Sequence, residues 1–403
     1  MTLDTAPLVY DPMDPAIQRD PYPIYRRLRE EDPVHRTARG FWVLSRFEDV
    51  YQAALDTSTF SSAQGLTFEK DEIIALGLKP TLVMMDRPLH TTFRRLISRG
   101  FTPRKVAGLE PTLRAFVRRR LSMLSGADEA DFVDVLAGPL PTLVVATYLG
   151  VPESDRTQFD AWSSAIVEAG AANDIVGRAA DAVAGLYAYF TELLEFKRRH
   201  PGDDMLTDLV RARVDGQALH LDEILGYCFV MIAGGNDTAA GLLGGSAVLL
   251  GEDMQQRGAL LKDPRRLTPA LEELLRLTSP VQGLSRTTTR DVDLHGATIP
   301  AGSKVHLLYG SGNRDPREFG PTADEFHVSR TFRRMLSFGN GPHHCIGAAA
   351  ARLQARVALG ELLDQFPHFR VDASRARLAP GPFVRRYEFL PLAPGRRRPV
   401  TDS

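Results

Sequence analysis

Residues 337–350 read SFGNGPHHCIGAAA, and this stretch carries the strongest structural signal in the chain. The glycines at 339, 341 and 347 permit backbone angles that are barred to other residues, so a tight turn here can hold the sulfur of Cys345 in one place. Strong helix formers follow Gly347, and the N-terminus of a helix carries partial positive charge that stabilises an anion. Both features favour the thiolate form of Cys345 over the thiol.

A thiolate held in a fixed geometry is a good ligand for heme iron, but Cys345 has other interpretations. A lone cysteine is most often a small buried hydrophobic residue, and Cys228 is given that interpretation. The two histidines before Cys345 could suggest zinc, although adjacent residues seldom converge on one metal ion and no CxxC or HxxxH pattern accompanies them. A Cys–His catalytic dyad is a third alternative, but it would not explain Phe338 and the glycines together.

The composition narrows the class of protein. The chain has 403 residues, with 49 Lys and Arg against 50 Asp and Glu, and its formal net charge of −1 argues against a nucleic-acid-binding protein. Two cysteines do not make a disulfide framework, and they fit a reducing compartment. Because neither a signal peptide nor a membrane-spanning segment is visible, the sequence predicts a cytoplasmic protein.

The chain is expected to form one domain over residues 1–403, mainly α with small β-sheets, and an extended N-terminal arm over residues 1–20. Almost all of residues 91–254 has helical spacing, in pieces that Pro and Gly separate. A hairpin is predicted over residues 34–43, and more short β-like pieces follow in the last third of the chain. A final helix is expected over about residues 348–365.

Other stretches place charged or small residues at helical spacing. Residues 231–241 read MIAGGNDTAAG, and because each of the two adjacent glycines should weaken a helix by about 1 kcal/mol, the pattern by itself favours two helices with a loop between them. Glu273 and Arg276 lie at i, i+3 on one helical face, which by itself predicts only a surface ion pair. His90 and Arg94 also share a helical face.

The stretch FGNGPHHCIG at residues 338–347 resembles the heme-binding loop of the cytochrome P-450 family, F-G-x-G-x-H-x-C-x-G, at every specified position. The resemblance implies the soluble bacterial type of that fold, a triangular prism with heme b between a long central helix and the cysteine loop. It implies that Cys345 ligates the iron and that Phe338 packs near the sulfur and tunes it. It also places His343 near a heme propionate, with Gly347 in the same loop.

Further motifs resemble those of the family. Gly234, Asp237 and Thr238 match the pattern of its central helix, which implies close approach to the heme, local unwinding, and an acid–alcohol pair that delivers protons to bound dioxygen. Splitting an O–O bond needs protons, and a hydroxyl can orient a water molecule that a nearby acid feeds. The resemblance assigns two more sets: a structural network (Glu273, Arg276, Arg330) and propionate partners (His90, Arg94, Arg286).

The activity that the resemblance implies is that of a heme-thiolate monooxygenase, which inserts one oxygen atom of O2 into a small lipophilic molecule. Because nothing in the chain resembles a flavin or iron–sulfur module, electrons are expected from a ferredoxin and its NAD(P)H-dependent reductase. An acidic ferredoxin would need a basic surface near the cysteine. A monomer that binds neither nucleic acid nor membranes is expected. The candidate docking residues are Arg333, Arg334, Arg352 and Arg356.

By the same resemblance, Val281, Gln282, Leu284 and Phe383 are expected to line an apolar substrate pocket, with Gln282 as a candidate polar anchor. The sequence does not indicate which aromatic compound, terpenoid, fatty acid or natural-product intermediate is oxidised. Two functions of other classes remain as alternatives. One is a heme-binding or sensor protein of the same fold that does not turn over, and the other is a helical protein without heme whose cysteine is structural.

Overall fold

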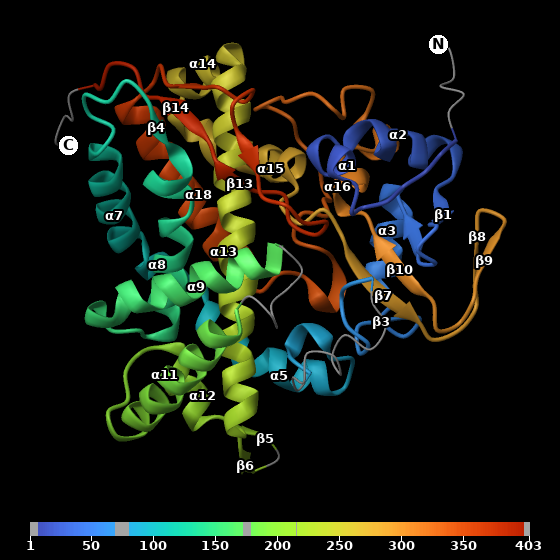
Figure 1. The fold of residues 1–403 in the computed structure, drawn as a ribbon, viewed down its shortest axis with the longest axis horizontal. Coiled ribbons are helices and arrows are strands. Elements are labelled where there is room, and N and C mark those ends of the chain that lie inside the picture. Colours follow the sequence, from blue (N-terminus) through green and yellow to red (C-terminus); the bar gives the residue numbers. More distant parts are fainter. Residues whose placement is uncertain (1–6, 69–79, 172–178, 215, 399–403) are drawn as a thin grey trace.

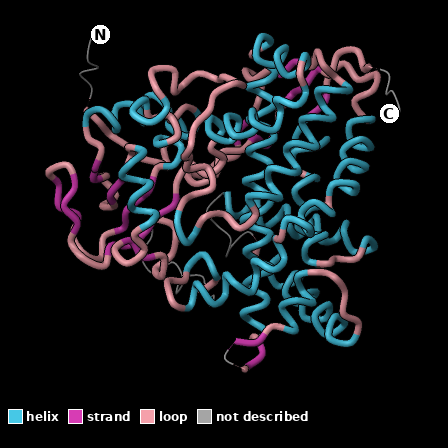
Figure 2. The backbone as a smooth tube through the Cα atoms, turned by 180° about the vertical axis from the view of Figure 1, so that it is seen from behind, coloured by secondary structure: helices cyan, strands magenta, loops and turns pink. Residues whose placement is uncertain are grey.

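The computed structural model describes residues 7–68, 80–171, 179–214 and 216–398. Long helices fill one side of the molecule, and the largest sheet lies on the other (Figure 1). The same division is visible from behind (Figure 2). This arrangement confirms the predicted mainly α fold with small sheets. Within the described ranges, no helix is long and apolar enough to cross a membrane.

The central element is α13 (Leu221–Glu252), a single helix of 32 residues that crosses the molecule (Figure 1). It packs against α8 (Pro139–Leu149), α9 (Arg156–Ala171) and α15 (Leu267–Thr278). The long central helix implied by the resemblance is therefore present, and the alternative of two helices with a loop is wrong. Packing on several neighbours outweighs the low helix propensity of glycine.

Close packing explains why α13 contains so many glycines. A Cβ atom at Gly235 would lie 2.8 Å from Cγ2 of Val145 on α8. A Cβ atom at Gly241 would lie 2.5 Å from the carbonyl oxygen of Arg385. Each glycine weakens the helix by about 1 kcal/mol, but it lets a neighbouring element approach the helix backbone directly.

The final helix, α18, spans Ala348–Gln365, as the sequence predicts. It packs against α7 (Glu110–Ser122) and against α15, and its leucines, its valine and three of its alanines (Ala350, Ala355 and Ala358) are buried in the largest hydrophobic core. Because α18 begins directly after the stretch that contains Cys345, this core fixes the direction in which the chain leaves the cysteine.

The largest sheet joins the two ends of the sequence. Its strand order is β1-β2-β10-β7-β3, and the predicted hairpin is formed by β1 (Val34–Arg36) and β2 (Trp42–Leu44). Strand β10 (Lys304–Leu307) pairs in parallel with β2 and antiparallel with β7 (Leu284–Thr288), and β3 (Phe60–Ser61) pairs with the far edge of β7. Strands from the early and the late parts of the sequence therefore share one sheet.

The predicted extended arm is wrong in its last part. Residues 7–14 have no regular secondary structure, but Pro15–Arg19 form a short helix, α1. The carboxylate of Asp14 accepts a hydrogen bond from the N–H of Ala16 (2.8 Å), and a proline in the first turn is compatible with a helix start. Residues 1–6 lie outside the described residues.

The remaining elements cover these cores or connect them. The helices are α2 (Tyr22–Glu31), α3 (Phe47–Leu55), α5 (Leu89–Ser98), α6 (Pro103–Gly108), α11 (Ala180–Arg199), α12 (Met205–Arg211), α14 (Met254–Lys262), α16 (Tyr309–Gly312) and α17 (Pro316–Phe319). Short helical turns are η1 (Leu82–Met84), η2 (Arg99–Phe101), the π-helical η3 (Val133–Ala137), η4 (Glu153–Asp155), η5 (Pro264–Arg266) and η6 (Gly341–His343). The other strands are β4 (Ala130–Asp131), β5 (Arg213–Val214), β6 (Gln217–Ala218), β8 (Val292–Leu294), β9 (Ala297–Ile299), β11 (Arg370–Val371), β12 (Arg377–Leu378), β13 (Tyr387–Phe389) and β14 (Pro391–Ala393).

Candidate active site

The stretch around Cys345 forms a tight loop that closes on itself. The N–H of Cys345 donates a hydrogen bond to the carbonyl oxygen of Phe338 (2.8 Å). Gly339 and Gly341 have φ angles of +64° and +67°, in the left-handed region that favours glycine. A Cβ atom at Gly341 would also lie 2.8 Å from the carbonyl oxygen of Ala54, at the end of α3. The loop therefore needs both glycines to turn and to rest on α3.

The two cysteines have different surroundings. Cys228 is fully buried in α13, and burial raises the pKa of its thiol, which fits the predicted structural role. The side chain of Cys345 is exposed. Burial by the surrounding loop still raises the pKa of Cys345, although the N–H of Gly347 and the charges of Arg94 and Arg352 lower it. The backbone donor and the two cations therefore favour the thiolate, as the loop sequence predicts, but they oppose a larger effect of desolvation on this pKa.

Phe338 is half-buried beside the loop, and a cation covers its ring. The guanidinium of Arg352, on α18, lies 4.6 Å from the ring centroid. The same guanidinium forms a two-pronged ion pair with Glu272, with distances of 2.6 and 2.8 Å. This contact fixes Arg352 near the loop, and no sequence pattern had assigned a role to Glu272.

Four of the predicted site residues come together on one side of the loop. The rings of His90, on α5, and His343 have centroids 4.2 Å apart. Burial, followed by the charge of Arg286 and smaller contributions from His90 and Arg94, lowers the pKa of His343 to about 3. Burial also lowers the pKa of His90. Both imidazoles are therefore neutral near pH 7, and the positive charge of this cluster comes from the two arginines.

Neither arginine of this cluster pairs with a carboxylate in the part of the chain that the structure describes. Arg94 donates to the carbonyl oxygen of His344 (2.5 Å), and the buried Arg286 donates to that of Ser285 (2.8 Å). Nε2 of His90 is buried and has no hydrogen-bond partner within the described ranges. Because unpaired buried cations and polar atoms are costly, the cluster is suited to bind an anionic group.

Gly234 and Thr238 lie one helical turn apart on an open side of α13. Gly234 is exposed, and a Cβ atom there would meet nothing within 4 Å. The hydroxyl of Thr238 donates a hydrogen bond to the carbonyl oxygen of Gly234 (2.9 Å). The helix is continuous at this point, so the expected local unwinding is not observed. The Gly234 carbonyl is instead occupied by the threonine.

Asp237 points in a different direction from Thr238. Its carboxylate forms an ion pair with Arg386, with Oδ1 2.5 Å from Nε, and the two side chains are only 12% and 11% exposed. Burial raises the pKa of Asp237 to about 6, although Arg386 opposes the shift. No sequence motif indicates a role for Arg386. The one general signal is that a buried acid needs a counter-ion, and this does not point to a particular residue.

The predicted network around Glu273 is present and fully buried. Arg276 forms two contacts with the Glu273 carboxylate (2.7 and 2.8 Å), and both side chains are 0% exposed. Arg330 donates to the same carboxylate (2.9 Å). Arg276 also donates to the carbonyl oxygens of Asn313 (2.7 Å) and Ala323 (2.6 Å). The pair is therefore far more than the surface ion pair that its spacing alone predicts.

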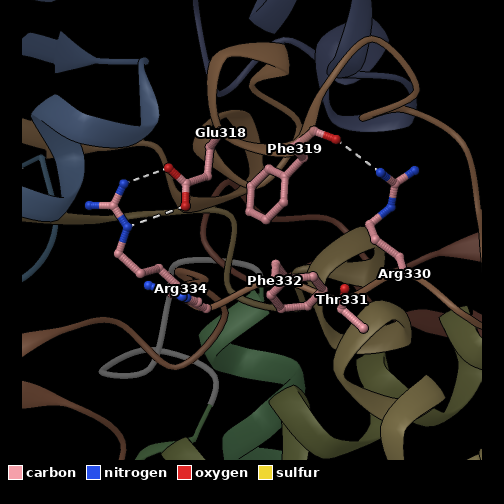
Figure 3. A pocket seen from close by; sticks show the side chains of 7 residues that line it. Glu318, Phe319, Arg330, Thr331, Phe332 and Arg334 are labelled. Atoms are coloured by element: carbon pink, nitrogen blue, oxygen red, sulfur yellow. Dashed lines mark hydrogen bonds and ion pairs between the residues drawn. The ribbon is translucent and has the colours of Figure 1, made fainter.

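Arg330 extends this network to the segment that precedes the cysteine loop. It donates to the carbonyl oxygens of Phe319 (2.9 Å) and Thr322 (2.7 Å). Figure 3 shows the contact with Phe319 at the rim of a surface pocket, where Arg334 pairs with Glu318 on the opposite side. The buried ion network and these surface contacts hold the chain on both sides of α17.

Comparison with known proteins agrees with this geometry. A family model described as "Cytochrome P450" matches residues 261–378. A protein named "Cytochrome P450 130", from Mycobacterium tuberculosis, is 53% identical over 383 residues, which cover 93% of this chain and 95% of that protein.

The chain belongs to the cytochrome P450 family. It is an oxidoreductase of the P450 monooxygenase class, and the cofactor of the family is heme b, bound through a cysteine thiolate.

Solved structures of other P450 proteins share the fold. Cytochrome P450 CYP109Q5 from Chondromyces apiculatus is 31% identical, with a TM-score of 0.87, and the match covers 98% of this chain and 100% of that one. CYP109E1 from Bacillus megaterium, solved in complex with testosterone, is 30% identical, with a TM-score of 0.84, over 93% of this chain and 99% of that one.

The residues of this P450 chain fit a bound heme. Two arginines that pair with no carboxylate of the described residues, and a His90 Nε2 that has no hydrogen-bond partner among them, match the need of two propionate groups for donors and positive charge. The open side of α13 at Gly234 leaves room for a flat ring system. An exposed cysteine in a rigid loop provides the soft ligand that heme iron requires.

Two predicted pocket residues, Val281 and Leu284, are half-buried against the apolar cluster beside the five-stranded sheet. Gln282 is buried, and both ends of its amide have protein partners. Its Nε2 donates to the carbonyl oxygen of Ser279 (2.7 Å), and its Oε1 accepts from the hydroxyl of Tyr25 (3.2 Å). These contacts give Gln282 a structural role, and they argue against the predicted polar anchor.

Phe383 belongs to an aromatic cluster. Its ring stacks on Phe68 with centroids 4.7 Å apart, and Phe68 stacks in turn on Phe41 at 4.5 Å. The buried imidazole of His306 meets Phe68 edge-on at 4.8 Å. Phe383 is therefore held in place by neighbours from the early part of the chain.

The predicted docking surface is less basic than the sequence indicated. Arg333 has no carboxylate partner among the described residues, but the other three candidates are neutralised by the chain itself. The ion pairs are Arg334 with Glu48 and Glu318, Arg352 with Glu272, and Arg356 with Glu110.

Replacing Glu273 by Gln is expected to destabilise the heme-loaded protein by about 3–5 kcal/mol, because two buried arginines lose their shared counter-charge. Denaturant unfolding would measure the change. Glu31→Gln is the matched control, since Glu31 pairs with Arg27 (2.8 Å) on the surface of α2, and no measurable change is expected there. Equal effects of the two substitutions would contradict the central role of Glu273.

Proposed function

We propose that this chain is a heme-thiolate monooxygenase in which Cys345 ligates the iron and one atom of O2 is inserted into a small lipophilic substrate. The observation that carries the proposal is the combination of an exposed cysteine in a tight loop with adjacent cations that pair with no carboxylate in the part of the chain that the structure describes. We also propose that residues 1–403 act as a single domain and a monomer. Heme held by a thiolate would supply reductive activation of dioxygen.

The chain's own residues would hold and orient the cofactor. Arg94 and Arg286 would pair with the propionates, and the neutral imidazoles of His90 and His343 would add hydrogen bonds. Gly347 would donate its N–H to the sulfur, which moderates the electron density on Cys345. Phe338 and the Arg352 guanidinium over its ring would keep water from the loop side of the sulfur.

Thr238 and Asp237 would divide the work of proton delivery. The Thr238 hydroxyl already donates to the Gly234 carbonyl, so its oxygen is free to accept a hydrogen bond from water on the open side of α13. Burial raises the pKa of Asp237 to about 6, close to neutral pH, so it can both release and regain a proton. A sensor protein without turnover would need neither group, and this favours the enzyme.

The substrate is proposed to be an apolar molecule of small to moderate size. Val281, Leu284 and Phe383 contribute apolar surface, and Gln282 is already occupied by Ser279 and Tyr25. Because the related CYP109E1 is solved with testosterone, neutral multi-ring compounds belong in the first screen beside aromatic, terpenoid and fatty acid compounds. A shift of the Soret band on binding would identify compounds that displace water from the iron.

Thr238→Ala is expected to separate NADH consumption from product formation. With a surrogate ferredoxin and reductase, the variant should oxidise NADH but form roughly tenfold less product per NADH, with peroxide in its place, because proton delivery is disordered. Thr147→Ala is the matched control, since Thr147 on α8 also donates to its i−4 carbonyl, that of Leu143 (2.7 Å). Absence of product from the wild type with any bound compound would favour the sensor alternative.

The ferredoxin is proposed to dock on α5 and its continuation into α6, because the cations there are available. Arg95, Arg99 and Arg104 are exposed, and none of them has a carboxylate partner among the described residues. Helix α5, which carries Arg95, also carries Arg94, which contacts the cysteine loop. An acidic partner on this surface would therefore lie close to the iron ligand.

Charge reversal at this surface should slow reduction of the enzyme by ferredoxin. The double change Arg95→Glu and Arg99→Glu is expected to lower the second-order rate of reduction about tenfold or more at low salt, and the difference from wild type should shrink as salt is raised. Arg265→Glu, in the turn η5 between α14 and α15 and 91% exposed, should leave the rate unchanged. Stopped-flow absorbance at the Soret band measures the rate, and equal slowing in both proteins would contradict the assignment.

A further inference from the structure

We propose that Arg385 and Arg386 are positioning residues that anchor Asp237 to the N-terminal helix α1, and we call them the arginine clamp. The proposal rests on the proposed function, in which Asp237 takes part in proton delivery. Neither arginine belongs to a motif, and both lie in the short segment between Val384 and strand β13.

The first half of the clamp is the contact of Arg386 with Asp237. Nε of Arg386 lies 2.5 Å from Oδ1 of Asp237, and both side chains are nearly buried. Among the described residues, Arg386 is the charged group whose field acts on this carboxyl. The adjacent Asn236 is buried and neutral, and neither end of its amide has a hydrogen-bond partner in the described part of the chain. The position of Arg386 therefore controls the electrostatic environment of Asp237.

The second half of the clamp is the contact of Arg385 with α1. Its guanidinium donates to the carbonyl oxygens of Gln18 (2.6 Å) and Arg19 (2.9 Å). These carbonyls lie at the C-terminal end of α1, where helix carbonyls lack partners within the helix and carry partial negative charge. A bidentate arginine satisfies two of them at once. A second contact joins α1 to this part of the chain, because the side chain of Gln18 accepts a hydrogen bond from the N–H of Gly381 (3.2 Å).

The backbone between the two side chains is held as well. The N–H of Arg385 donates to the carbonyl oxygen of Pro280 (2.7 Å), and the carbonyl oxygen of Arg386 accepts from the N–H of Ala379 (2.9 Å). The carbonyl of Arg385 rests on Gly241, where a Cβ atom would lie only 2.5 Å away. Gly241 is one helical turn beyond Asp237 on the same face of α13.

These contacts make one continuous connection. Arg385 is held by α1 through its side chain and by Pro280 through its backbone N–H, and its carbonyl lies against Gly241 of α13. The next residue, Arg386, reaches the carboxyl of Asp237. If the hydrogen bonds between Arg385 and α1 were removed, the side chain of Arg386 would be less well positioned, and its ion pair with Asp237 would weaken. The carboxylate would then be less stabilised in its buried site, and its proton affinity would rise.

The test follows the titration of Asp237 in the heme-loaded enzyme. Infrared spectroscopy would monitor the carboxyl band that disappears in Asp237→Asn, and the pH midpoint of product formed per NADH would be measured in parallel. Arg386→Gln is expected to raise both midpoints by about one pH unit, because an opposite charge at contact distance is lost. Arg386→Lys should stay close to wild type, because it keeps the charge.

Arg385→Gln is the decisive variant. It should shift both midpoints in the same direction as Arg386→Gln but by less, and the double variant should shift them no further than Arg386→Gln alone, since the two residues act through one contact. Arg377→Gln is the control, because Arg377 pairs with Glu388 (3.3 Å) on the surface of the same hairpin, and it should shift neither.

Two results would overturn the clamp. One is an Arg385→Gln protein that unfolds at a lower temperature but keeps the wild-type midpoint, which would make Arg385 a purely structural residue. The other is an Arg386→Gln protein whose carboxyl band titrates as in wild type. Because the infrared titration needs no turnover, absence of product in every protein, with the shifts present, would count against the proposed function and leave the clamp supported.

Discussion

One buried carboxylate, that of Glu273, holds together the part of the chain on which the site depends. Arg276 and Arg330 share it, and their remaining donors bind carbonyl oxygens of the segment from Asn313 to Thr322 and beyond. A buried ion pair is weak evidence for added stability, because desolvation offsets much of the attraction. Its value here is geometric. The carboxylate fixes the segment that leads into the cysteine loop, and α18 fixes the segment that leaves it.

The site between these supports is organised around negative charge that the chain does not supply. Burial raises the pKa of Cys345, so the loop presents a thiol that an iron ion would convert to thiolate on binding. Beside the loop, Arg94 and Arg286 lack carboxylate partners among the described residues. On the open side of α13, Gly234 leaves space and Thr238 offers a hydroxyl oxygen. By themselves, the buried cation is energetically unfavourable and the open side of the helix has no role in the fold. A bound heme with two propionates would account for these features together.

The features that could be predicted from the sequence are those with local signals. The cysteine loop, the bounds of α18 and the face shared by Glu273 and Arg276 follow from spacing and from glycine chemistry, and the family resemblance added Arg330. The features that could not be predicted depend on distant neighbours. Helix α13 is continuous because neighbours such as Val145 of α8 pack directly on its glycines. The side chain of Asp237 is oriented by its ion pair with Arg386, near the C-terminus. The pairing of the predicted docking arginines likewise required acids from other helices.

The most direct test of the central claim is the reduced-plus-carbon-monoxide difference spectrum of the heme-loaded protein, with each cysteine replaced in turn. A thiolate-ligated iron gives a Soret band at a characteristic red-shifted position. We predict this band in the wild type and in Cys228→Ala. We predict that Cys345→Ala loses the band, whether or not that variant retains heme. A wild-type protein without the band, or a Cys345→Ala protein that keeps it, would contradict the assignment of Cys345 as the iron ligand.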